Sequence, residues 1–161
     1  MYSSFIEALK ECECIYMLLI KNNLIAITIH ICLSIIMFFP FLYVYNGAVT
    51  DNIILGWLKL VIYTAIPLFV YIWAGKKFLT DTHNPLINFF SVMAIAIIIV
   101  IATYLWEIIV NLPFFFVGAF ISSIVLDIPG GSAEEKYIFY IISLFPSLSM
   151  WIGLRFKRSV K

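Results

Sequence analysis

Residues 86–109 read LINFFSVMAIAIIIVIATYLWEII and decide the class of fold. Glu107 is the only charged residue in this stretch. A hydrocarbon core about 30 Å thick needs roughly 20 helical residues to cross it. A crossing segment must also be helical, because lipid offers no partner for backbone amides and carbonyls. The stretch therefore predicts a membrane-spanning helix over 86–109.

Three other stretches have the same character, at 24–45, 53–74 and 137–154. Hydrophobic residues make up 64% of the 161 residues and charged residues 12%, whereas a soluble domain has roughly 45–50% and about 25%. Lipid must therefore cover part of the surface. We predict an all-α integral membrane protein, in which residues 1–161 form a single membrane domain built as a four-transmembrane-helix bundle.

Basic residues predict the orientation of this bundle. Eight of them flank the same ends of the four predicted spans: Lys10, Lys21, Lys76, Lys77, Arg155, Lys157, Arg158 and Lys161. Because cytoplasmic loops are enriched in Lys and Arg, we expect both termini and the basic tail 155–161 in the cytoplasm, with the chain in the plasma membrane. Frequent use of residues with AT-rich codons, such as Ile, Asn and Lys, hints at a bacterial source.

Two shorter segments complete the predicted architecture. Residues 3–21 have helical periodicity and predict an amphipathic helix in the inner interface, which Asn22–Asn23 would end; the alternative is a soluble extension. Residues 113–126, PFFFVGAFISSIVL, are short for a crossing. We expect them to form an outer re-entrant or surface helix, because a fifth span would move the basic tail outside, against the charge rule.

Proline and small residues predict how the spans pack. Pro40, Pro67 and Pro146 lie within three of them, where a proline removes a backbone hydrogen bond and bends the helix. In the last span, small residues recur at fourfold spacing and predict one close helix contact: Ser143 with Ser147, and Ser149 with Gly153. Trp73 and Trp151 are expected to anchor the inner membrane boundary.

Ionisable residues at membrane depth are the candidate site residues. Lys59 and Glu107 have opposite charges and matched depth, so we predict that they meet in the outer half of the bundle, with Asn111 one turn beyond. A substrate or ion site, a structural pair and two side chains snorkelling to the boundary are the alternatives. We expect His30 to be a hydrogen-bonding group between helices rather than a ligand.

The remaining polar residues predict ordinary structural roles. Before the third span, Asp81, Thr82 and Asn84 are expected to cap the helix or form the loop, and Asn88 is expected to have no special role. Cys12-x-Cys14 has too few ligands nearby for a structural zinc site. We therefore predict no cofactor and no metal.

Function is constrained mainly by missing motifs. The chain has no HExxH, GxSxG, P-loop or CxxC motif, which are the common signatures of catalytic and nucleotide sites. We expect a non-enzymatic protein that acts by contact within the bilayer, such as a toxin-immunity protein or an accessory subunit. Its expected partners are membrane lipid, another membrane protein or a second copy, and no nucleic acid. The alternatives are a small oligomeric transporter or channel using Lys59 and Glu107, and an enzyme acting on lipid headgroups.

Overall fold

A computed structural model describes residues 2–46, 53–106 and 133–158. Within these ranges every regular element is a helix and there is no strand, which confirms the all-α prediction. The helices are α1 (Tyr2–Asn46), α2 (Ile53–Phe78), α3 (Pro85–Phe90), α4 (Ala94–Trp106), α6 (Ala133–Ile142) and α7 (Phe145–Arg158).

Three helical stretches among the described residues are long and apolar enough to cross a membrane. They are Glu13–Phe38, Pro85–Ala102 and Tyr137–Lys157. The chain is therefore consistent with a membrane protein, while the count of four spans stays a prediction.

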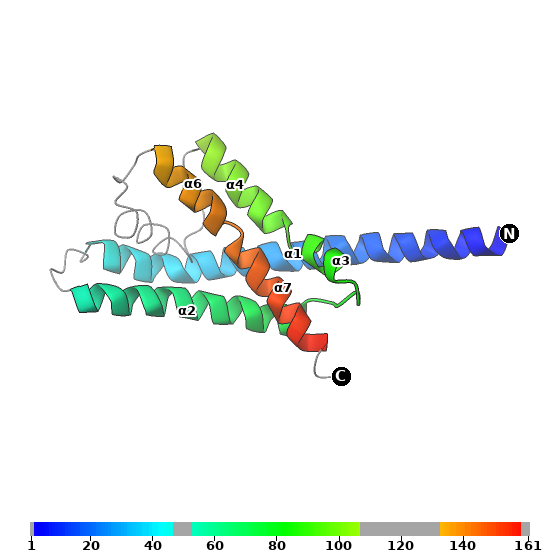
Figure 1. Cartoon of the computed structure of the whole chain (residues 1–161), viewed down its shortest axis with the longest axis horizontal. Helices are drawn as coiled ribbons and strands as arrows, with labels where there is room; N and C mark the ends of the chain where they lie inside the picture. The colour runs from blue at the N-terminus through cyan, green and yellow to red at the C-terminus, as the bar shows by residue number, and fades with distance from the viewer. Residues whose placement is uncertain (1, 47–52, 107–132, 159–161) are drawn as a thin grey trace.

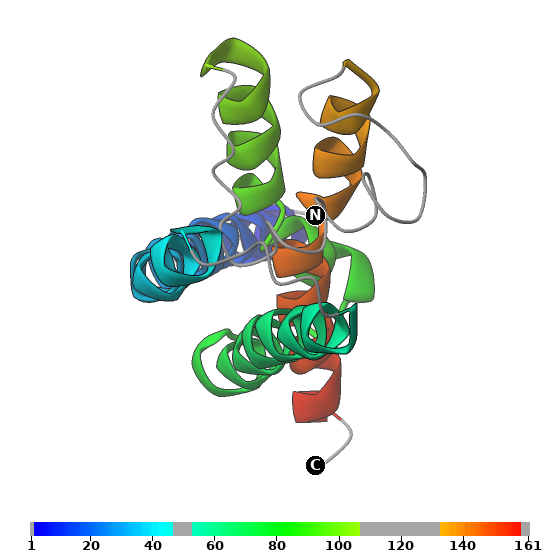
Figure 2. The ribbon, with the colours of Figure 1, turned by 90° about the vertical axis from the view of Figure 1, so that its left-hand side faces the viewer.

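The helices form two pairs that lie at a steep angle to one another. Figure 1 shows α1 and α2 running side by side, and α4 beside α6. Seen along α1 and α2, the α4–α6 pair rises away from them (Figure 2). Helix α7 continues from α6 and crosses α2, which is the most extensive contact between helices in the described part of the chain. The two pairs thus converge where α3, α7 and the loop after α2 meet.

Helix α1 is continuous through Asn22 and Asn23, so the predicted break at these residues is wrong. Asparagine interrupts a helix when its side chain competes for the helix's own backbone groups. Here both side-chain amides bond to other segments, and the one bond that Asn23 makes to its own helix, to the Leu19 carbonyl, leaves the backbone of α1 helical. An interfacial position for residues 3–21 stays a prediction.

Two predicted spans are instead interrupted near their middle. The 86–109 segment contains a turn at 91–93 between α3 and α4, and the 137–154 segment contains a turn at 143–144 between α6 and α7. The second turn comes just before Pro146, which has no backbone N–H to continue the helix, and so agrees with the bend predicted there. The first turn was not predicted. Helices α1 and α2 continue through Pro40 and Pro67.

Helices α2 and α7 cross with their backbones in contact, and we call this contact the glycine crossing. A Cβ atom added at Gly153 would overlap the carbonyl oxygen of Ile72, and one added at Gly75 would overlap the carbonyl oxygen of Met150. The close contact predicted in the last span is confirmed at Gly153, which faces the backbone of Ile72 and Lys76 on α2. Close approach of this kind is typical of packing between membrane helices.

Candidate functional site: a buried polar junction

The side chains of three of the four predicted polar candidates fall outside the part of the chain that the structure describes. Glu107 and Asn111 lie outside the described residues, as does the segment 113–126, and the side chain of Lys59 is likewise outside them although its backbone belongs to α2. The pairing of Lys59 with Glu107 therefore stays a prediction.

His30, the fourth candidate, is buried between α1 and α2 with 6% of its surface exposed. Its Nδ1 atom lies 2.6 Å from the hydroxyl oxygen of Tyr71, and the two rings stack with their centroids 6.1 Å apart. His30 thus makes the hydrogen bond between helices that the sequence predicts for it. Its other ring nitrogen, Nε2, and the hydroxyl of Ser34 one turn along are buried without a hydrogen-bond partner in the described part of the chain.

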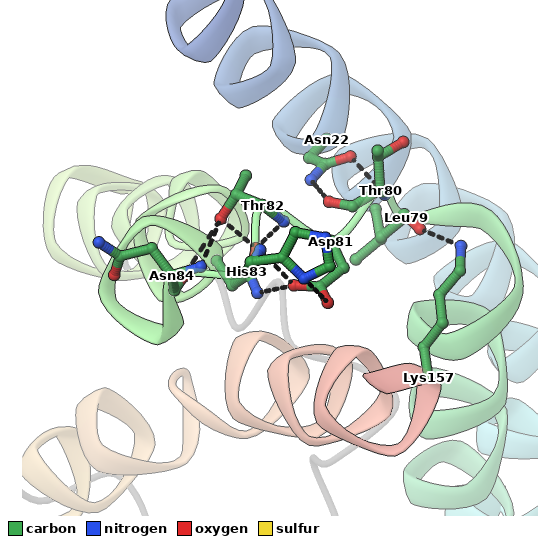
Figure 3. A network of polar contacts seen from close by, with 9 residues as sticks. Asn22, Leu79, Thr80, Asp81, Thr82, His83, Asn84 and Lys157 are labelled. Atoms are coloured by element: carbon green, nitrogen blue, oxygen red, sulfur yellow. Dashed lines mark hydrogen bonds and ion pairs between the residues drawn. The ribbon is translucent and has the colours of Figure 1, made fainter. Parts of the chain in front are cut away.

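A denser group of polar contacts lies where the helices converge. Asn22 on α1 is fully buried and pairs with the backbone of Thr80 in the loop after α2 (Figure 3). The Thr80 N–H donates to Asn22 Oδ1 at 3.0 Å, and Asn22 Nδ2 donates to the Thr80 carbonyl at 2.9 Å. The same Nδ2 donates to the Ser91 hydroxyl at 3.2 Å. The amide of Asn22 therefore completes the hydrogen bonding of a loop residue and joins three segments.

Asn23, the next residue of α1, bonds to the turn between α3 and α4. Its Nδ2 donates to the Phe90 carbonyl at 3.2 Å, and its Oδ1 accepts from the Ala94 N–H at 3.1 Å. From the other side, the Ser147 hydroxyl donates to the Val92 carbonyl at 2.7 Å. Side chains from α1 and α7 thus satisfy backbone groups that the interruption of the helix exposes. We call the contacts of Asn22 and Asn23 the asparagine junction.

The loop before α3 is ordered by side-chain caps, as the sequence predicts. Asn84 is the N-cap of α3, and its side chain accepts from the N–H groups of Leu86 and Ile87. His83, at φ 62°, donates its backbone N–H to Asp81 Oδ1 at 2.9 Å. Figure 3 shows Asp81, Thr82, His83 and Asn84 together in this loop.

Asn88 has a structural role that the sequence analysis did not assign to it. It is 4% exposed, and its Oδ1 accepts from the Thr82 N–H at 2.9 Å and from the Thr82 hydroxyl at 2.8 Å. Its Nδ2 donates to Asp81. The expectation that Asn88 needs no special role is wrong, because one turn of helix brings its side chain back over the loop that precedes it.

Basic and aromatic residues surround this loop at the same end of the bundle. Lys157 Nζ donates to the Leu79 carbonyl at 2.8 Å (Figure 3), and Trp151 Nε1 donates to the Pro85 carbonyl at 3.0 Å. Arg155 lies over the Trp151 ring, 5.1 Å from its centroid. A cation near the last carbonyls of a helix is favourable because it faces the negative end of the helix dipole. The lysine bond fastens the end of α7 to the end of α2, and the tryptophan bond fastens α7 to the start of α3.

The described residues offer little for bond-making chemistry. Among them no group of three or more His, Cys, Asp or Glu side chains could hold a metal ion, and the thiols of Cys14 and Cys32 are free and exposed. The polar groups of the asparagine junction bond to one another and to the backbone. Such an arrangement holds helices in register rather than presenting reactive groups.

No protein-family model, curated protein or solved structure matches this chain. The junction was not predicted from the sequence, because Asn22 and Asn23 were placed at a helix break. The signal that could have revealed it is their position beside a long apolar stretch, where a polar side chain normally bonds to a neighbouring helix.

Proposed function

We propose that the chain is a non-enzymatic membrane protein that acts by contact within the bilayer. The observation that carries this proposal is the contrast between its interior and its surface. Inside, the asparagine junction uses its polar groups to join helices. Outside, large apolar side chains are exposed on every long described helix, including Ile35 and Ile36 on α1, Phe69 on α2, Tyr104 on α4 and Ile141 on α6.

An apolar exterior of this kind is covered by lipid or by another membrane segment. A protein that protects a membrane from a toxin, or an accessory subunit of a membrane complex, needs a stable shape and an apolar contact face. It needs no catalytic group. The proposed partners are therefore membrane lipid together with another membrane protein or a second copy of this chain.

Site-specific photo-crosslinking in native membranes tests this proposal. A photoreactive phenylalanine analogue would replace Phe69, Tyr104 or Ile141, which are exposed on three different helices. We expect a discrete protein adduct from one face and lipid adducts from the others, and an adduct of twice the monomer mass would identify a second copy. Lipid adducts alone at all three positions would contradict contact with a protein partner.

A transporter or channel is the second candidate, and one observation favours it. The turn at 91–93 lies against the first turn of α7, because the Ser147 hydroxyl bonds to the Val92 carbonyl. Discontinuous membrane helices form the binding sites of many transporters. Flux of ions or amino acids into proteoliposomes, abolished by Glu107→Gln or Lys59→Met, would support this candidate over the first. The third candidate, an enzyme acting on lipid headgroups, rests on Glu107 and Asn111.

We also propose the finer topology, with four spans, both termini in the cytoplasm and residues 127–136 outside a bacterial plasma membrane. The support comes from basic residues at the ends of two helices, Lys76 and Lys77 on α2 and Arg155 and Lys157 on α7. These two ends lie together, because Lys157 bonds to the Leu79 carbonyl. Single cysteines at Ser132 and Ser159, in a chain without native cysteines, can be labelled on whole cells with an impermeant thiol reagent. We expect labelling at Ser132 alone. Labelling at Ser159 alone would show that the last span has the opposite orientation to the one proposed.

A further inference from the structure

The turn at 91–93 interrupts a helix whose own sequence gives no reason to stop. Residues 86–106 contain neither proline nor glycine, which are the usual causes of a sharp kink within a helix. Ser91 donates its hydroxyl to the Asn88 carbonyl at 2.8 Å. A serine that bonds back in this way bends a helix slightly and does not separate two helices. The cause must lie outside the segment.

Asn23 supplies that cause. In an uninterrupted α-helix the N–H of residue 94 donates to the carbonyl of residue 90. In the structure, the Asn23 side chain bonds to both of these groups, because Oδ1 accepts from the Ala94 N–H and Nδ2 donates to the Phe90 carbonyl. That carbonyl also accepts from the Met93 N–H at 3.4 Å. A side chain inserted between the two partners of a helical hydrogen bond is a known cause of a kink. Figures 1 and 2 show α4 leaving the junction at an angle to α3.

A bond within α1 keeps the Asn23 amide in this position, because Asn23 Nδ2 also donates to the Leu19 carbonyl at 3.0 Å. Asn22 makes separate bonds, to Thr80 and Ser91. The turn is therefore maintained by α1, a separate and continuous helix, and lasts only while α1 stays in register with it.

We propose that residues 85–106 form a two-state element whose interrupted state is held by Asn23. When α1 moves away, the Ala94 N–H loses its partner, and the Phe90 carbonyl keeps only the 3.4 Å bond from the Met93 N–H. An unpaired backbone N–H is very costly in lipid, and this one can pair with the Phe90 carbonyl. The helices α3 and α4 then join into one helix, so that a partner or force that displaces α1 changes the shape of the α4–α6 pair. Elements with two discrete packings are the usual basis of conformational switching.

Distance measurements between two spin labels test this proposal in the full-length protein reconstituted in lipid nanodiscs. The labels replace Leu86 and Tyr104, which are 67% and 72% exposed, in a chain without native cysteines. In one continuous helix their Cα atoms would lie about 27 Å apart, and a bend at the turn is expected to shorten this distance. We expect Asn23→Leu to lengthen the distance to about 27 Å.

Asn22→Leu is the matched control. It removes the adjacent amide from the same helix but leaves the Phe90 and Ala94 contacts, so the label distance should stay at the wild-type value. A second label pair at Phe69 on α2 and Ile152 on α7 should be unchanged in both variants, which shows that the bundle is intact.

Two results would overturn the proposal. The first is an Asn23→Leu variant in which the distance between labels 86 and 104 stays at the wild-type value while the α2–α7 label distance is unchanged. The second is an Asn22→Leu variant in which the 86–104 distance lengthens as much as in Asn23→Leu. If the α2–α7 label distance changes in Asn23→Leu, the bundle itself is disturbed. The Asn23→Ala variant is then measured with the same labels, and the same two results would overturn the proposal.

Discussion

The glycine crossing and the asparagine junction join helices by opposite means. At the crossing of α2 and α7, Gly75 and Gly153 have no side chain, and the two backbones touch. At the junction, Asn22 and Asn23 of α1 use their side chains to satisfy the backbones of other segments. The first contact requires that no side chain stands between the two backbones, and the second requires hydrogen bonds from side chains.

The difference shows which constraint each region places on the sequence. Helices in lipid gain little from burying apolar surface against one another, so their association depends on close packing and on hydrogen bonds between them. The glycine crossing should therefore reject any larger residue and tolerate the loss of polar groups. At the asparagine junction, a change in side-chain size should affect stability less than the loss of the side-chain amide.

The largest expected effect is at the glycine crossing. Gly153→Val places new carbon atoms where the carbonyl oxygen of Ile72 lies, so α7 must move away from α2. We expect a loss of about 3 kcal/mol or more of unfolding free energy, measured by denaturant titration in mixed micelles. The control is Ala65→Val on an exposed face of α2, which should change the unfolding free energy little. An equal loss in both variants would show that the crossing is not close-packed.

The next effect is at the asparagine junction. Asn22→Leu keeps the side-chain volume but removes the hydrogen bonds to Thr80 and Ser91. We expect a loss of about 2 kcal/mol, together with faster hydrogen exchange at the Thr80 amide. Unchanged exchange at Thr80 would mean that the loop after α2 is held by other contacts.

A smaller effect is expected where α7 meets α3. Trp151→Phe removes the indole N–H that donates to the Pro85 carbonyl but keeps an aromatic ring beneath Arg155. Since a single hydrogen bond is lost, we expect about 0.5–1 kcal/mol in the same unfolding assay. Trp73→Phe is the comparison, because the described contacts of Trp73 are to its ring, with Phe78 and Lys77. A larger loss of unfolding free energy in Trp73→Phe than in Trp151→Phe would show that the Trp151 hydrogen bond contributes little to stability.

The smallest effect is expected at the C-terminal end of α2. Lys157→Met removes the ammonium group that bonds to the Leu79 carbonyl, and a charge at this position is worth about 0.5 kcal/mol. Because salt screens exposed charges, the difference between wild type and variant should shrink as NaCl is raised. A difference that does not depend on salt would point to lost packing of the lysine stem instead.

Several features followed from local sequence rules that the structure bears out. The apolar stretches predicted helices, since backbone groups in lipid can be satisfied only within a helix. Asn84 predicted a helix cap, Pro146 predicted a bend, and the spacing of Ser149 and Gly153 predicted a close contact. Each of these rules concerns a residue and its own few neighbours along the chain.

Tertiary structure alone decided the turn between α3 and α4 and the role of the adjacent asparagines. Local rules assign Asn22 and Asn23 to a helix end, because an asparagine without a distant partner competes for its own backbone. The structure provides such partners, and Asn23 lies 71 positions from Ala94, which donates to it. A helix whose own residues favour continuity is interrupted there because a side chain from another helix bonds to both groups that would have closed the next turn.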